Sequence, residues 1–92
     1  MTTVKGERLI NISATADETY VIDYSTSFSV SIFNHTDGIV SVALREQYAS
    51  GSTASGCIKI AAGAFCNNLK VPGSRLYLTP AASGDISVMR VE

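Results

Sequence analysis

The chain has 92 residues, with seven Lys or Arg against eight Asp or Glu, and a formal net charge of -1. This near-neutral charge gives no electrostatic footprint for duplex nucleic acid or an anionic membrane, so neither is expected as a partner. The length fits a single domain, residues 1–92, which is small enough to leave much of its surface exposed. Burial of that surface against another protein is therefore a real option.

No targeting segment is expected from the sequence. Its first eight residues contain no apolar signal region, and no later segment approaches the ~18 apolar residues of a membrane helix. The protein is therefore expected to be made in a cytosol, where Cys57 and Cys66 stay as free thiols. If the strands around them form a hairpin, Cys57 faces Asn68 and has only a diagonal contact with Cys66, but the residues alone do not settle whether they pair.

The N-terminal third alternates apolar and polar residues with a period of two, which is typical of half-buried strands. Strands are predicted over residues 8–14 and 19–24, separated by a turn at Asp17-Glu18. In the first strand Ile10, Ile12 and Ala14 form an apolar face opposite a mixed one. In the second, Tyr20, Ile22 and Tyr24 lie on one side, with Val21 and Asp23 on the other.

The stretch from 27 to 45 carries the clearest pattern, with alternation on both sides of Asp37-Gly38. An antiparallel hairpin is predicted, because facing residues then share a side of the sheet. A two-residue turn would mix the faces, whereas a three-residue loop aligns Ile32 with Val42 and Val30 with Leu44. The three-residue loop is preferred, with Gly38 at the position that needs positive φ.

Residues 45–56 divide into two parts. Residues 45–49 contain good helix formers and could form one short helical turn. Residues 50–56, the sequence SGSTASG, form an uncharged loop of small residues. This loop is the best candidate for a surface that orders on contact with a partner.

The C-terminal third reads as a series of short strands. They are predicted over residues 57–60, 65–70, 75–79 and 86–91, with Phe65 and Leu69 on one side of the second. Pro72-Gly73 predicts a type II turn, in which the glycine has positive φ. The last strand is apolar on both faces, so it is expected to be buried on both sides or to pair with a neighbouring subunit.

Together these elements predict an all-β fold. About eight short strands with regular turns and no long helix indicate an antiparallel β-sandwich, with jelly-roll connections as an open alternative. In a jelly roll, successive strands can lie in opposite sheets. The register of the central pair would then fail, with residues 33–39 forming a corner between the sheets.

No catalytic, metal-binding or cofactor-binding motif stands out. His35 is the one histidine and lies beside a turn, where it is expected to be solvated or bonded to the loop. The C-x8-C spacing of the cysteines matches no common pair of zinc ligands, and no G-x-S-x-G marks a nucleophile. The protein is therefore predicted not to be an enzyme, and no cofactor or metal is expected.

The aromatic residues are assigned mainly to the core. Without tryptophan and with few basic neighbours, packing is the expected role of five of them: Tyr20, Tyr24, Phe28, Phe65 and Tyr77. Tyr48 and Tyr77 are kept as candidates for contact with a ligand.

From Cys57 onward the order of features resembles a known group of proteins. A strand ending in IAAGA, an aromatic-led return, PGSRLYL, a small-residue turn and a final GDISVMRVE resemble the C-terminal half of small β-sandwich virion proteins of tailed bacteriophages, such as capsid decoration (cement) or tail accessory proteins. The central VSIFNHTDGIVSV segment is similar in style. The resemblance implies a homo-oligomer, often a trimer, on the outside of a shell, and carries over no catalytic residues.

Two functions follow as hypotheses. The first is a non-enzymatic virion protein, made in the host cytoplasm, that binds a major capsid or other virion protein. Its predicted partner-binding residues are Ser52, Thr53, Ala54, Met89 and Val91. The alternative is a carbohydrate- or receptor-binding module that uses Tyr48 and Tyr77.

Overall fold

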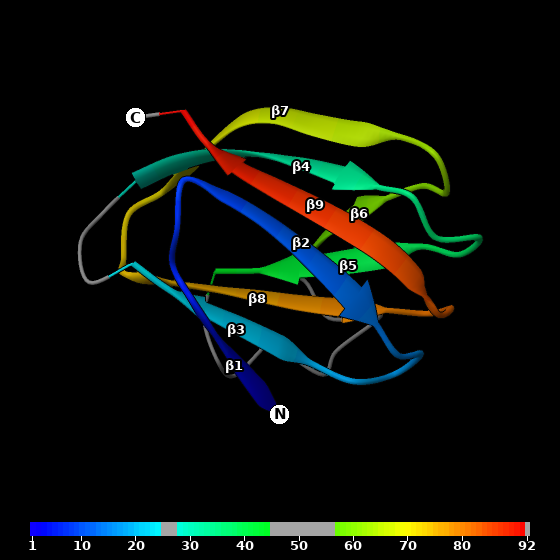
Figure 1. Cartoon of the computed structure of the whole chain (residues 1–92). Coiled ribbons are helices and arrows are strands. Elements are labelled where there is room, and N and C mark those ends of the chain that lie inside the picture. Colours follow the sequence, from blue (N-terminus) through cyan, green and yellow to red (C-terminus); the bar gives the residue numbers. More distant parts are fainter. Residues whose placement is uncertain (25–27, 45–56, 92) are drawn as a thin grey trace.

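The computed structural model describes residues 1–24, 28–44 and 57–91. Within them, nine strands form two packed sheets, which confirms the prediction of an all-β sandwich (Figure 1). The strands are β1 (Thr2–Lys5), β2 (Leu9–Ala14), β3 (Tyr20–Asp23), β4 (Phe28–Asn34), β5 (Val40–Ala43), β6 (Cys57–Ile60), β7 (Phe65–Val71), β8 (Arg75–Pro80) and β9 (Gly84–Arg90).

The chain changes sheets at almost every connection. Sheet A has the order β1-β3-β8-β5-β6 and sheet B the order β2-β9-β4-β7. Among these strands, β5 and β6 are the one consecutive pair that shares a sheet, so the architecture is not a series of hairpins. Such switching is the behaviour expected of jelly-roll connections.

The predicted central hairpin is wrong. Strand β4 lies in sheet B and β5 in sheet A, so Ile32 faces Val88 and Cys66, while Val42 faces Leu78 and Ile58. The alternation itself was interpreted correctly, since the inward residues of both strands reach the core. A hairpin and a corner between two sheets bury the same residues, and therefore the pattern could not distinguish them.

Asn34 fixes the corner between β4 and β5. Its side chain is 1% exposed and donates to the carbonyl oxygens of Gly38, Ile60 and Ala61 at 2.8, 2.9 and 3.1 Å. Its Oδ1 accepts from the backbone N–H and the hydroxyl of Thr36, at 2.9 and 2.7 Å. The buried Asn34 amide thus joins the corner between β4 and β5 to the end of β6 and to the residue that follows it.

The second predicted hairpin, around AAGA, is also a connection between sheets. Cys57 lies opposite Ala43 in sheet A, and Cys66 lies opposite Ile32 in sheet B. Cys57 therefore does not face Asn68, as the hairpin had required. Cys66 is a free thiol, half-buried against the core.

Two glycines predicted to have positive φ do not have it. Among the described glycines, positive φ occurs at Gly63 (75°) and Gly84 (152°), and not at Gly38 or Gly73. The predictions assumed tight hairpin turns, but the strands on either side of each glycine lie in opposite sheets. A connection between sheets does not impose the geometry of a hairpin turn.

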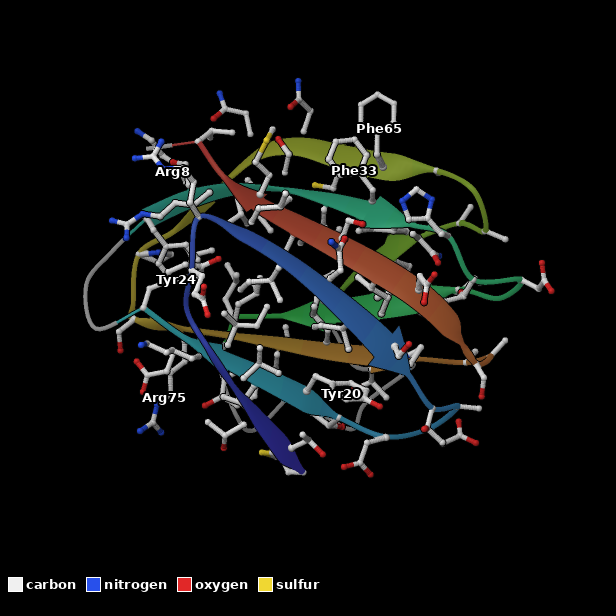
Figure 2. The ribbon with its side chains drawn as sticks, in the orientation of Figure 1. Arg8, Tyr20, Tyr24, Phe33, Phe65 and Arg75 are labelled. Carbon is white, nitrogen blue, oxygen red and sulfur yellow. The ribbon has the colours of Figure 1, made fainter. Side chains whose placement is uncertain are left out.

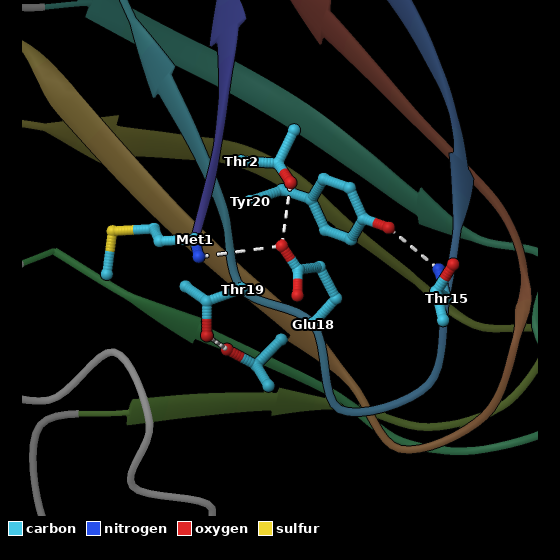
Figure 3. A network of polar contacts seen from close by, with 7 residues as sticks. Met1, Thr2, Thr15, Glu18, Thr19 and Tyr20 are labelled. Carbon is cyan, nitrogen blue, oxygen red and sulfur yellow. Dashed lines mark hydrogen bonds and ion pairs between the residues drawn. The ribbon is translucent and has the colours of Figure 1, made fainter.

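Strand β1 was missed by the sequence analysis, and it makes sheet A mixed rather than antiparallel. It runs parallel to β3, and the backbone N–H of Thr2 donates to the carbonyl of Thr19 at 2.8 Å. The Thr2 hydroxyl also donates to the Glu18 carboxylate at 2.6 Å (Figure 3). The pKa of Glu18 is lowered mainly by this hydrogen bond and, to a smaller extent, by the positive charge of the N-terminal ammonium. These contacts join residues that are far apart in the sequence, so a local sequence pattern does not predict them.

The core lies between the two sheets. Its completely buried aliphatic side chains come from alternating positions of five strands: Ile22, Val30, Ile32, Val40, Val42, Leu76, Leu78, Ile86 and Val88. At about 1.5 to 3 kcal/mol for each buried aliphatic side chain, this layer is the main stabilising term of the fold. The described buried side-chain N and O atoms all have hydrogen-bond partners, as a native core requires.

Tyr24 closes one end of the core, and its hydroxyl is expected to make the free energy of unfolding depend on pH in the alkaline range. The ring packs 4.2 Å from Phe28 and the hydroxyl donates to the Glu7 carbonyl at 3.0 Å. Burial raises the pKa of Tyr24, and the charge of Arg90, 5.4 Å from the ring, partly offsets this. As pH rises through the ordinary tyrosine pKa of about 10, the unfolded chain therefore loses this proton first.

Stability from Tyr24 is accordingly expected to be complete below about pH 10 and to fall above it. Melting temperatures measured between pH 9 and 11 should fall less steeply for Tyr24→Phe than for the wild type. Equal slopes would contradict the assignment.

Candidate protein interface on the outer face of sheet B

The outer face of sheet B points away from the core and carries an aromatic row formed by Phe33, His35 and Phe65. Phe33 in β4 lies opposite Phe65 in β7, with ring centroids 5.7 Å apart. The His35 ring is nearly parallel to Phe33, at 8° and 6.5 Å. Phe65 is 62% exposed, and Figure 2 shows both phenyl rings projecting from the sheet. The row is therefore accessible to a partner.

The exposure of Phe65 corrects the prediction that it packs in the core beside Leu69. The register of β7 against β4 shifts between Val30 and Ile32, and Asn68 has a φ of 57°. This bulge adds one residue and reverses the alternation, so Leu69 points inward and Phe65 outward. The pair Asn67-Asn68 was the available signal, because asparagine tolerates positive φ.

Ser31 holds the bulge in place. Its hydroxyl, 1% exposed, donates to the Asn67 side chain at 2.7 Å and accepts from the backbone N–H of Asn68 at 3.3 Å. The extra residue of the bulge therefore keeps a hydrogen-bond partner. The rotation of β7 that exposes Phe65 is built into the sheet rather than left to a mobile loop.

A second, aliphatic group lies at the other end of this face and consists of Leu9, Met89 and Val91. Leu9 in β2 is 60% exposed and lies directly opposite Met89 in β9, which is 39% exposed. Val91 follows the end of β9 and is 43% exposed. Met89 and Val91, predicted as apolar anchors, are thus on the surface, and Leu9 is a neighbour that the sequence analysis did not single out.

The position of β9 corrects another prediction. The strand is not buried on both faces, because Met89 is exposed, and it does not offer an edge to another subunit. Both of its edges are occupied within the chain, by β2 and β4. A partner can therefore contact Met89 from the outer face of the sheet, but cannot add a strand beside β9.

Polar side chains between the two apolar groups bond to one another. Ser87 donates to the Oδ1 of Asn11 at 2.7 Å, and Ser31 bonds to Asn67. A partner covering this face would therefore strand few hydrogen-bonding groups, and this lowers the cost of desolvation. Mixed apolar and internally satisfied polar surface is typical of protein interfaces.

The other predicted site residues fall elsewhere. Tyr77 is 5% exposed and packs with Val21 and Ala43 on the outer side of sheet A. The pKa of the neighbouring Arg75 is raised mainly by a hydrogen bond with Tyr77 and, to a smaller extent, by one with Asp23. Four further predicted residues lie outside the described part of the chain: Tyr48, Ser52, Thr53 and Ala54.

His35 is exposed and takes part in the aromatic row, and no group of three or more His, Cys, Asp or Glu in residues 1–24, 28–44 and 57–91 could hold a metal ion. A hollow of about 160 Å³ in this part of the chain is lined by Ile39, Lys59 and Pro80, among others. A ligand pocket usually measures about 300 Å³ or more.

No protein-family description, curated protein or solved structure matches this chain. The described residues form no helix that is both long and apolar enough to span a membrane.

Proposed function

We propose that the protein is a non-enzymatic interaction protein that binds a repetitive protein surface through the outer face of sheet B, as a capsid decoration protein or another virion accessory protein. The observation that carries this proposal is the pairing of two apolar groups on the outer face, Leu9 with Met89 and the half-buried Phe33 with the exposed Phe65, across neighbouring strands of one sheet. Aromatic residues and methionine are enriched in protein interfaces.

Rigidity supports this role. Phe33 and Met89 project from β4 and β9, the two interior strands of sheet B, so their backbone positions are set by pairing on both sides. Ordering such residues on binding costs little conformational entropy, which favours affinity. The virion context comes from the resemblance of the sequence, and the partner expected from it is the major capsid protein.

The direct test is Met89→Asp, with binding measured by cosedimentation with shells assembled from the major capsid protein of the same genome. A carboxylate in an apolar contact is costly to desolvate, so affinity is expected to fall by tenfold or more, about 1.4 kcal/mol. The melting temperature should change little, because the side chain is exposed.

Ile39→Asp is the matched control, since Ile39 is 46% exposed but belongs to the hollow with Lys59 and Ser41 rather than to sheet B. It should bind like the wild type. Undiminished binding by Met89→Asp, or an equal loss in both variants, would exclude the outer face of sheet B as the contact.

A carbohydrate- or receptor-binding module is the second candidate, and the aromatic row favours it. Flat rings exposed on a rigid sheet can stack against a sugar, and here Phe33 and Phe65 occupy that position rather than Tyr77. A glycan array separates the two functions. A saturable signal that Phe65→Ala abolishes would support this candidate over capsid binding.

A further inference from the structure

Strand β2 forms one edge of sheet B, and among the described residues β9 alone pairs with it. The backbone N–H of Arg90 donates to the carbonyl of Arg8, so the even-numbered residues of β2 exchange hydrogen bonds with β9. The N–H and C=O groups of Leu9, Asn11 and Ser13 must then point away from β9, toward the free edge of the sheet. They form an open row of donors and acceptors.

The other edges of the sandwich carry features that discourage further pairing, and β2 does not. Strand β7 is interrupted by the bulge at Asn68 and carries Lys70. Strands β1 and β6 have four residues each and carry Lys5 and Lys59. Strand β2 has six residues, pairs with β9 without a register shift, and contains no charge or proline. Long, regular, uncharged edges are templates for pairing.

We propose that β2 pairs antiparallel with β2 of a second copy of this chain, about a twofold axis at Asn11. In that register Asn11 faces itself and Leu9 faces Ser13 of the second copy. Every outward N–H and C=O of these three residues then meets its complement. No like charges oppose each other, because none of the three is charged.

The second copy is the occupant that the strand itself favours. An odd number of outward residues with Asn11 at the centre makes the edge complementary to itself in one register, and a slip by two residues would leave groups unpaired at both ends. The two B sheets would join into one continuous sheet. Their outer faces would lie side by side, and two linked faces bind a repetitive surface more tightly than one.

The inference stands independently of the proposed function, because it concerns the edge of β2 and not its outer face. Sedimentation velocity of the whole chain, at concentrations up to about 1 mM, where even weak complexes form, should show a species of twice the monomer mass. A monomer throughout this range would overturn the proposal.

Asn11→Pro removes an N–H that points away from β9, so it should abolish the dimer while leaving the ladder with β9 intact. Thr3→Pro is the matched control. The N–H groups of Thr2 and Gly6 donate to the carbonyls of Thr19 and Asp23, which turns the N–H of Thr3 toward the free edge of β1. This variant should remain dimeric. A dimer that persists in Asn11→Pro would refute the pairing.

A charge exchange tests the register without relying on proline. Asn11→Lys and Asn11→Glu each place like charges face to face across the axis, so each variant alone should be monomeric. An equimolar mixture should recover the dimer, since residue 11 faces residue 11 only in the proposed register. Failure of the mixture to associate would overturn the proposal, whatever the outcome of the capsid-binding assay.

Discussion

Replacing Asn34 with Ala is expected to lower the free energy of unfolding by about 3 to 4 kcal/mol. The change removes the Asn34 donor from the carbonyls of Ile60 and Ala61 and the acceptor of the Thr36 N–H, whereas the Gly38 carbonyl keeps the Thr36 hydroxyl as a donor. Each buried polar group left unpaired costs about 1 to 3 kcal/mol, partly offset where water can enter. A loss of this size is a large share of the stability of a small domain.

The measurement is urea unfolding followed by circular dichroism, with Asn11→Ala as the matched control. The exposed side chain of Asn11 accepts a hydrogen bond from Ser87, and the loss of this surface bond should cost less than about 0.5 kcal/mol. If both variants unfold at the same urea concentration, Asn34 does not hold the corner between β4 and β5.

Gly84→Ala is expected to cost about 2 to 4 kcal/mol. Gly84 has a φ of 152°, a conformation that residues with a Cβ rarely adopt, and such strain costs roughly 1 to 3 kcal/mol. A Cβ at this position would also lie 2.9 Å from the Cα and 3.1 Å from the Cβ of Thr36. Thr36 cannot easily move away, because Asn34 holds both its N–H and its hydroxyl.

Thermal unfolding of Gly84→Ala checks this prediction, with Gly73→Ala as the control. A Cβ on Gly73 would meet no atom within 4 Å, and its φ is not positive, so that change should be neutral or slightly stabilising. The double variant Asn34→Ala/Gly84→Ala should lose less than the sum of the single changes, since releasing Thr36 relieves the contact. Full additivity would show that the two residues act separately.

The candidate interface illustrates how far pattern analysis reached. The alternation placed Ile86 and Val88 on one side of the last strand and Met89 on the other, because period two is a local property of a strand, but it did not predict that the side of Met89 is exposed. Phe65 was predicted to pack in the core, but its side chain is exposed. Its side was reversed by a bulge that depends on Ser31, a residue far away in the sequence.

Leu9 was missed for a related reason. Its exposure was visible in the pattern of residues 9–14, but its contact with Met89 arises because the first strand of sheet B pairs with the last strand of the chain. Ring contacts such as Phe33 with Phe65 likewise need two strands in register. Such pairings are long-range, and the local pattern of one sequence carries no record of them.

The sequence by itself determined the all-β class, the inward residues of most strands and the absence of a strong charge, because these follow from local alternation and composition. The tertiary structure alone decided which sheet each strand joins, where β1 pairs, which way Phe65 faces and that β2 is left with an open edge. The physical reason is that hairpins and corners bury the same side chains. Buried hydrogen bonds, above all those of Asn34, select between them.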